Sequence, residues 1–600
     1  MNRLRGLLVS SGLCFGLMAA SALALPPVLE RVPDNAAVAL AIPAPQTLEK
    51  NLTALSTAIG AQFPLPTMKD LLTMGGMAKG VDDSKSLAIV LFAPKQPEKA
   101  EGHAPGAPEI VPPSEDDAVF LVPVTSYADL LQNFEAKPAG EGKVDTITLP
   151  DGSEGFAKDI GGGYAAIGSN KAIIESFTGK PGDQPFKARM GKAGEALADA
   201  ADVVTVVNMD VLRPLAREGV EEMKKEAKGR LEALGQDADS QMAVANWIGE
   251  TIVRDTRMVT SAIRIGTMGV SLDSVGAFND GSYLAKVFAT KGEATPLLSK
   301  LPIRPFLFAG AMDTSAPAVK QLFRDLISKT SIPGGENAAK VAAASIADFD
   351  GQSGVVGFPQ GGALSGLLTS TVTFTKASDP AAALKTIKES VLVMNDQTIQ
   401  GMTYKATITD AGAKVGDTPV DVWEWKISSD GSNQMAAQGM QMIFGSPTGA
   451  SGFLAKSDTG VYRTFAKNSD LLGAALGVGK GTEALSTDAM LKQVGEQLPK
   501  SRVAEGYLGV KSLLDMVLPL ATMAGVPVPA DQIPEKLPPL GMSVSADSGA
   551  ARLSLFVPAP VIKVGVAMGE SFMQMQDDGM GGGEPAPADK GKSGAGQPKF

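Results

Sequence analysis

The sequence predicts an α+β protein of two related domains, each a largely antiparallel sheet with helices packed on one face. Three observations support this class. Short apolar runs bounded by turn residues are typical of strands, apolar residues at helical spacing follow many of them, and the combined pattern recurs in both halves of the chain. We therefore expect a first domain at 25–300 and a second domain, its duplicate, at 301–576.

The pattern is clearest at 118–134, AVFLVPVTSYADLLQNF. A run of β-forming residues leads to Ser126, a good N-cap, and then to apolar residues at helical spacing: Leu130, Leu131 and Phe134. The equivalent stretch of the second half is 371–387, where we expect Ser378 to be the cap and Pro380 to lie in the first helical turn. The two stretches should hold equivalent places in two sheets.

The remaining elements of the first half follow from the same signals. Strands are expected at 38–42, 86–92, 144–149, 155–159, 164–168, 258–265, 269–272 and 275–278, and helices at 46–55 and within 211–255. The segment 94–117 is rich in proline and charge, so we expect a disordered loop there.

The second half repeats this plan. Strands are expected at 348–358, 363–374, 402–409 and 420–427, followed at 432–451 by an insertion rich in Gln, Met and Gly that is interpreted as a surface flap. The tail 577–600 has almost nothing to bury and should be disordered.

Residues 1–24 have the form of a secretory signal peptide, with Arg3 and Arg5 before an apolar run at 7–20. Ala22 and Ala24 make a small-x-small cleavage site, so the exported chain should begin at Leu25. A retained anchor helix is the alternative, although the apolar run is short. We expect the protein to be exported, either to the periplasm or to the outside of the cell, with no further membrane span.

The charge and the cysteine content exclude several classes of function. The chain has 54 basic and 65 acidic residues, a formal charge of −11, which argues against nucleic acid and against binding to anionic lipid by bulk charge. Its one cysteine, Cys14, lies in the predicted signal peptide. The exported chain should therefore hold no disulfide, thiolate metal site or cysteine nucleophile.

No catalytic, cofactor or metal motif stands out. The one histidine, His103, lies in the proline-rich loop, and the glycines of 161–168 suit a hairpin turn better than a phosphate-binding loop. Two methionine pairs have a spacing that can bind Cu(I): Met440 with Met442, and Met573 with Met575. Filling gaps in the core is the more common use of methionine. Trp423 and Trp425 should share one strand face, as core residues or as a stacking surface.

The signal peptide, the segment 32–43 (VPDNAAVALAIP), the repeated units and the closing segment 553–568 together resemble a group of exported, uncharacterised bacterial proteins with a tandemly duplicated domain of unknown function. The resemblance implies a secreted α+β protein and carries no catalytic residues. Our leading hypothesis is a non-enzymatic protein that binds an apolar ligand or an envelope partner between sheet and helices. The alternative is a hydrolase with an unrecognised carboxylate site.

Overall fold

The structure, a computed structural model, describes residues 26–61, 67–93, 114–140, 142–182, 185–233, 238–330, 335–359, 365–399, 402–429, 434–523 and 532–580. The predicted cleavage residues Ala22, Ala24 and Leu25 lie outside this part of the chain, as do His103, residues 94–113 of the predicted loop and residues 581–600 of the predicted tail. Residues 115–117, which the sequence assigns to the loop, form the 3-10 helix η2, where Ser114 donates to the Asp117 carboxylate.

Strands occupy a third of the chain and alternate with helices. They are β1 (Ala36–Ile42), β2 (Leu87–Phe92), β3 (Ala118–Pro123), β4 (Asp145–Thr148), β5 (Glu154–Gly161), β6 (Tyr164–Gly168), β7 (Val203–Asn208), β8 (Thr256–Gly266), β9 (Gly269–Phe278), β10 (Phe306–Asp313), β11 (Gly351–Gly357), β12 (Thr371–Lys376), β13 (Thr398–Ile399), β14 (Met402–Val415), β15 (Thr418–Ser429), β16 (Gly449–Ser457), β17 (Gly460–Thr464), β18 (Arg502–Leu508), β19 (Leu540–Asp547) and β20 (Ala550–Pro558).

The helices are η1 (Pro27–Arg31), α2 (Pro45–Ile59), α3 (Met68–Met74), η2 (Glu115–Asp117), α4 (Tyr127–Leu131), α5 (Lys171–Ser176), α6 (Phe186–Asp199), α7 (Met209–Ala233), α8 (Ala238–Asp255), α9 (Tyr283–Val287), α10 (Thr295–Leu298), α11 (Pro317–Lys329), α12 (Gly335–Asp348), α13 (Pro380–Leu392), α14 (Gln434–Phe444), α15 (Ser469–Leu476), η4 (Leu485–Thr487), α16 (Ala489–Gly495), α17 (Val510–Met523) and α18 (Ala559–Met580). The insertion expected as a flap thus contains α14 and the start of β16.

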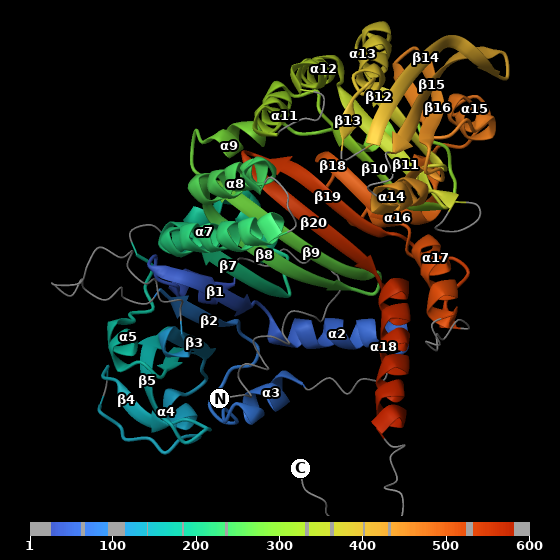
Figure 1. The fold of residues 1–600 in the computed structure, drawn as a ribbon. Helices are drawn as coiled ribbons and strands as arrows, with labels where there is room; N and C mark the ends of the chain where they lie inside the picture. The colour runs from blue at the N-terminus through green and yellow to red at the C-terminus, as the bar shows by residue number, and fades with distance from the viewer. Residues whose placement is uncertain are drawn as a thin grey trace, which may run out of the picture.

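All the strands belong to one antiparallel sheet of 20 strands, not to two separate sheets as expected. Figure 1 shows the sheet running through the whole molecule, with β9 and β20 side by side at its centre. Pairing β9 with β20 leaves neither as an exposed edge strand, which is a physical reason for the two halves to join. The pairing is centred on Asp273 and Ser554, which lie directly opposite each other.

The strand order outward from this central pair is alike in the two halves. In the first half it is β9, β8, β7, β1, β2, β3, β6, β5 and β4. In the second half it is β20, β19, β18, β10, β11, β12, β17, β16 and β15, followed by β14 and β13.

The two stretches compared in the sequence both contain the predicted strand and helix, but their caps differ. Ser126 caps α4 as expected, accepting from the backbone N–H of Asp129. In the second half the cap is Asp379, and the predicted cap, Ser378, instead donates to Asp350. The reason is that Pro380 occupies the first helical position, which makes its predecessor the cap. In α4 the fully buried residue is Leu130, whereas Leu131 is only partly buried.

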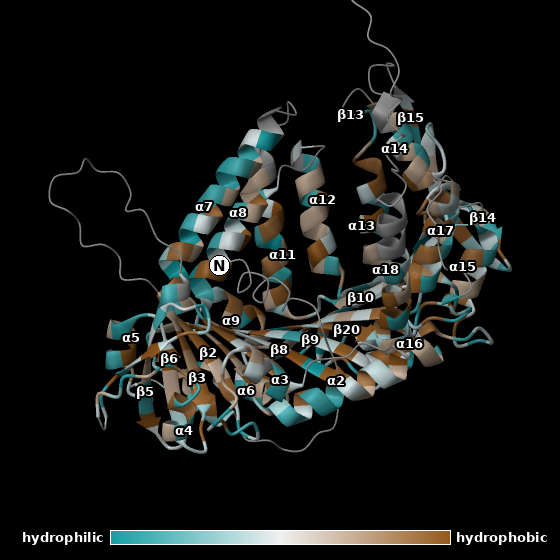
Figure 2. Ribbon diagram, turned by 90° about the horizontal axis from the view of Figure 1, so that it is seen from below, coloured by the Kyte–Doolittle hydropathy of each residue, from teal (hydrophilic) through white to brown (hydrophobic). Residues whose placement is uncertain are grey.

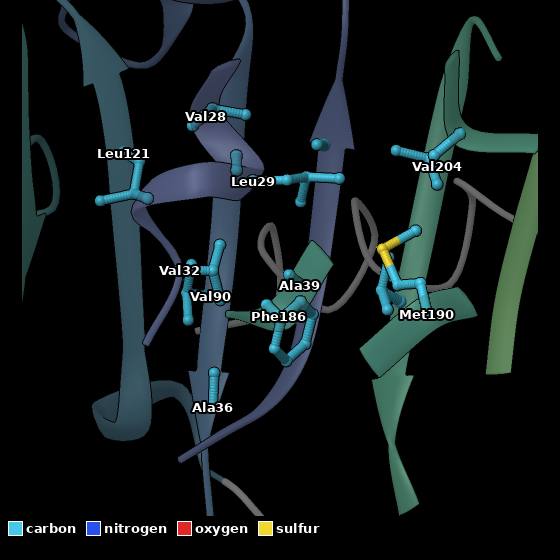
Figure 3. Packing of buried hydrophobic residues seen from close by; sticks show 14 of the residues in the cluster. Val28, Leu29, Val32, Ala36, Ala39, Val90, Leu121, Phe186, Met190 and Val204 are labelled. Atoms are coloured by element: carbon cyan, nitrogen blue, oxygen red, sulfur yellow. The ribbon is translucent and has the colours of Figure 1, made fainter. Parts of the chain in front are cut away.

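Helices cover both faces of the sheet, which corrects the expectation of one covered face. In β7, Val204 packs with Phe186 and Met190 of α6, as Figure 3 shows from close by. The preceding residue, Val203, packs on the opposite side with Leu55 of α2. Because neighbouring strand residues point to opposite faces, both faces of β7 are apolar and both hold helices.

Candidate ligand-binding face

The five central strands, in the order β10, β18, β19, β20 and β9, are buried on one face and uncovered on the other. We call the uncovered side the open face; its most exposed residues are Leu553 (58% exposed), Phe308 (40%) and Met542 (38%). Around them lie partly exposed residues of the same face: Leu272, Val356, Leu508, Val544 and Leu555. Large apolar side chains in the middle of a sheet are normally covered, so this exposure is informative.

The open face is uncharged across these strands. Its positions hold Phe, Met, Leu, Val, Ala, Gly and one serine, Ser274, and no Asp, Glu, Lys or Arg. The opposite face, which we call the buried face, holds Asp273, Glu505 and Ser543, each less than 5% exposed. The central strands therefore invert the usual arrangement, in which the apolar side is buried and the polar side meets water.

Phe308 forms a flat part of the open face because its neighbours lack side chains. Gly310 and Gly506 lie opposite each other on β10 and β18, and a Cβ atom at either position would come within 3.1 Å of the Phe308 ring. These glycines let the ring lie on the strands with one side exposed. The third glycine of the row, Gly354 on β11, lies opposite Gly310.

Helices border the open face at both ends of the central strands. At one end α9 and α11 pack with Ala546 of β19. At the other end α2 and α18 pack with Ile263 and Ile265 of β8. Leu553 and Met542 lie between these two helix groups. Figure 2 shows α7, α8, α11, α12 and α13 on one side of the sheet and apolar, brown segments along the central strands.

The buried face of the central strands holds two carboxylates, Asp273 and Glu505, and both are paired with arginine. Asp273 accepts from Arg264 (Nη2 at 2.7 Å) and from Arg552 (Nη2 at 3.0 Å), and also from the Ser554 hydroxyl. Burial alone would raise the pKa of Asp273, but the two arginines and the hydroxyl outweigh it and hold that pKa below its usual range. This carboxylate is therefore ionised and stabilising at neutral pH.

The second buried carboxylate, Glu505, contacts Arg502 and accepts from the Tyr507 hydroxyl at 2.9 Å. Burial, with the Glu505 charge, raises the pKa of Tyr507. Asp273 and Glu505 are separated on one cross-strand row by Ser554 and Ser543. Three strand spacings of about 4.8 Å place them about 14 Å apart, beyond the roughly 5–9.5 Å of paired catalytic carboxylates. The pair thus gives the hydrolase alternative no support.

The structure also places the tryptophans, the glycine turn and one of the methionine pairs singled out in the sequence. Trp423 is fully buried, and its ring contacts Trp425 edge to face at 5.4 Å. The glycines at 161–163 have positive φ angles in the turn between β5 and β6. Met440 and Met442 lie two residues apart on α14, so their side chains point in different directions. Within the described ranges, no group of three or more His, Cys, Asp or Glu is placed to hold a metal ion.

Searches of protein-family models, of curated proteins and of solved structures find no match to this chain. Among the described helices, none combines the length and apolarity that crossing a bilayer requires.

Sequence reasoning did not select the open-face residues. The segment Leu553–Ser554–Leu555 alternates apolar and polar residues, which predicts a strand with one buried face, but the usual assignment places the leucines inside.

Proposed function

We propose that the chain is a non-enzymatic secreted or periplasmic protein that binds an apolar ligand, or an apolar part of an envelope partner, on the open face. The observation that carries this proposal is Leu553, which is more than half exposed in the middle of a 20-stranded sheet, on a face without charge. An uncharged surface of this kind costs free energy in water and recovers it when an apolar molecule covers it.

Export is part of the proposal. It rests on the signal-peptide features of residues 1–24 and on the resemblance of the chain to exported bacterial proteins with a duplicated domain. An exported carrier without disulfides needs a large core, and the clusters on both sides of the sheet supply one.

We also infer that the two halves, 25–300 and 301–576, descend from a tandem duplication. The matching strand order on the two sides of the β9–β20 pair supports this inference. So does the register of that pair: the fifth residue of β9, Asp273, lies opposite the fifth residue of β20, Ser554, as a two-fold arrangement of like strands requires.

The test is a titration with the apolar fluorophore N-phenyl-1-naphthylamine, whose emission rises in apolar surroundings. Covering a leucine completely is worth about 1.5–3 kcal/mol, so covering the exposed 58% of Leu553 is worth about 1–2 kcal/mol. Leu553→Asp should therefore raise the Kd by at least about fivefold and, because the site is exposed, leave the melting temperature unchanged.

The matched control is Met74→Asp on α3, where the methionine is 77% exposed and does not belong to the sheet. It should bind the fluorophore as the unaltered chain does. Equal affinity of the Leu553→Asp chain and the control, or no binding by the unaltered chain, would refute the proposed function.

A further inference from the structure

Arg463 is the first charged residue met along one cross-strand row of the open face, and the row continues beyond it to Leu454 and Asp421. Starting from β8, this row contains Ile263, Leu272, Leu555, Met542, Gly506, Gly310, Gly354, Thr373 and Arg463. Residues directly opposite each other in antiparallel strands point to the same side. Arg463 therefore shares its face with the apolar residues of the central strands, and it lies where α13 begins to cover that face.

The Arg463 guanidinium has aromatic neighbours and no anion. Its Cζ lies 4.7 Å from the ring centre of Trp423 and 4.7 Å from that of Phe465. Its Nε is buried without a hydrogen-bond partner, and within the described ranges no carboxylate pairs with it. Burial lowers the pKa of Arg463 to about 10, so the group still carries its charge at neutral pH.

Three other arginines of the sheet have carboxylate partners. Arg502 contacts Glu505, and Arg264 and Arg552 both bind Asp273. A buried cation without a counter-charge is costly, and stacking on two rings offsets only part of that cost. Arg463 is thus held in place by its aromatic neighbours with its donors free for an anion from outside the described chain.

The row that leads to Arg463 has the dimensions and polarity of an extended acyl chain. Five strand steps separate Met542 from Arg463, about 24 Å at about 4.8 Å per step. Between them lie three glycines, the flat Phe308 ring and Thr373, with no charged side chain. An uncharged track that leads to a cation without a carboxylate partner among the described residues is complementary to a molecule with a long hydrocarbon chain and one anionic end.

We propose that the open face binds a long-chain carboxylate, with its carboxylate on Arg463 and its chain across β12, β11, β10, β18 and β19. This inference rests on the proposed function and specifies its ligand. A guanidinium can donate two parallel N–H bonds to one carboxylate, which suits a ligand with a single carboxylate head group. The aromatic rings orient the guanidinium before the ligand arrives, which reduces the entropic cost of binding.

The experiment measures displacement of N-phenyl-1-naphthylamine from the full chain by hexadecanoate and by hexadecanol, which share a chain and differ in charge. We expect hexadecanoate to bind at least about tenfold more tightly. Arg463→Met should abolish that preference while hexadecanol binds as before, and Arg463→Lys should keep part of it. Because Arg463→Met removes an unpaired buried charge, the ligand-free variant should melt no lower than the unaltered chain.

The matched control is Arg304→Met. The Nε of Arg304 is also buried without a partner, but this arginine lies beside Gly357 on the buried face. Its variant should keep the preference for hexadecanoate. Two results would overturn the carboxylate assignment and leave the proposed function standing. One is a preference for hexadecanoate that survives Arg463→Met; the other is tight binding of hexadecyl phosphate without binding of hexadecanoate. Failure of both ligands and of the fluorophore to bind would refute the proposed function itself.

Discussion

Asp273→Asn tests whether the two halves are held together by charge at the centre of the sheet. Asp273 belongs to β9, and two of its donors, Arg552 and Ser554, belong to β20 of the other half. Arg264 of β8 binds its second oxygen, with Nε at 3.2 Å and Nη2 at 2.7 Å. The substitution keeps the size of the side chain and removes its charge, so that both arginines lose their counter-ion.

The expected cost follows from burial. The Asp273 side chain is fully buried, whereas the side chains of Arg264 and Arg552 are 32% and 25% exposed. Breaking a buried ion pair costs about 3–5 kcal/mol, and water can partly solvate these two arginines, so we expect a loss near the lower end, about 3 kcal/mol. Glu226→Gln, at a pair that is exposed on both sides, should leave the free energy of unfolding unchanged.

The assay is urea unfolding of both variants at pH 7 and at pH 3. Because the folded-state pKa of Asp273 is lowered, its contribution to stability is present above the unfolded value of about 3.9 and is lost as the pH falls through the folded-state pKa. The difference between the unaltered chain and Asp273→Asn should therefore shrink at acidic pH. A cost at pH 7 no larger than that of Glu226→Gln, or one that grows on acidification, would refute this reasoning.

Two further predictions concern the chain ends and local structure. N-terminal sequencing of the exported protein should begin at Leu25, because Ala24 completes the cleavage site; an intact N-terminus in the exported protein would show instead that the apolar segment is retained. Ser126→Ala removes the hydroxyl that accepts from the backbone N–H of Asp129 at the start of α4. It should lower the free energy of unfolding, measured in urea, by about 1 kcal/mol. An unchanged midpoint of urea unfolding would contradict this prediction.

Local patterns predicted much of the fold. At 118–134 the strand and the cap appear where the sequence places them, whereas the helix ends at Leu131, before the predicted helical residue Phe134. The continuity of the sheet was not predictable in the same way. The sequence of β20 predicts a strand but does not predict its partner. That partner, β9, is about 280 residues away in the sequence, and the backbone hydrogen bonds that join the two strands leave no pattern in the side chains.

The candidate site was missed for a related reason. Alternation at 553–555 shows that leucine and serine lie on opposite faces, but not which face is covered. Coverage depends on helices from distant parts of the chain, here α6 and α16 on the buried face, which pack against β9 and β19. Arg463 gives no motif at all, because its significance comes from the absence of a carboxylate across the strands beside it.

The most direct test of ligand binding on the open face is a fluorescent label at its centre. In a Cys14→Ser chain, Leu553→Cys introduces the one cysteine available for an environment-sensitive dye such as acrylodan, and Met74→Cys provides the control. Hexadecanoate should shift the emission of the dye at position 553 to shorter wavelength, because the ligand excludes water there, and should leave the dye at position 74 unchanged. No shift at position 553, or equal shifts at both positions, would contradict the account.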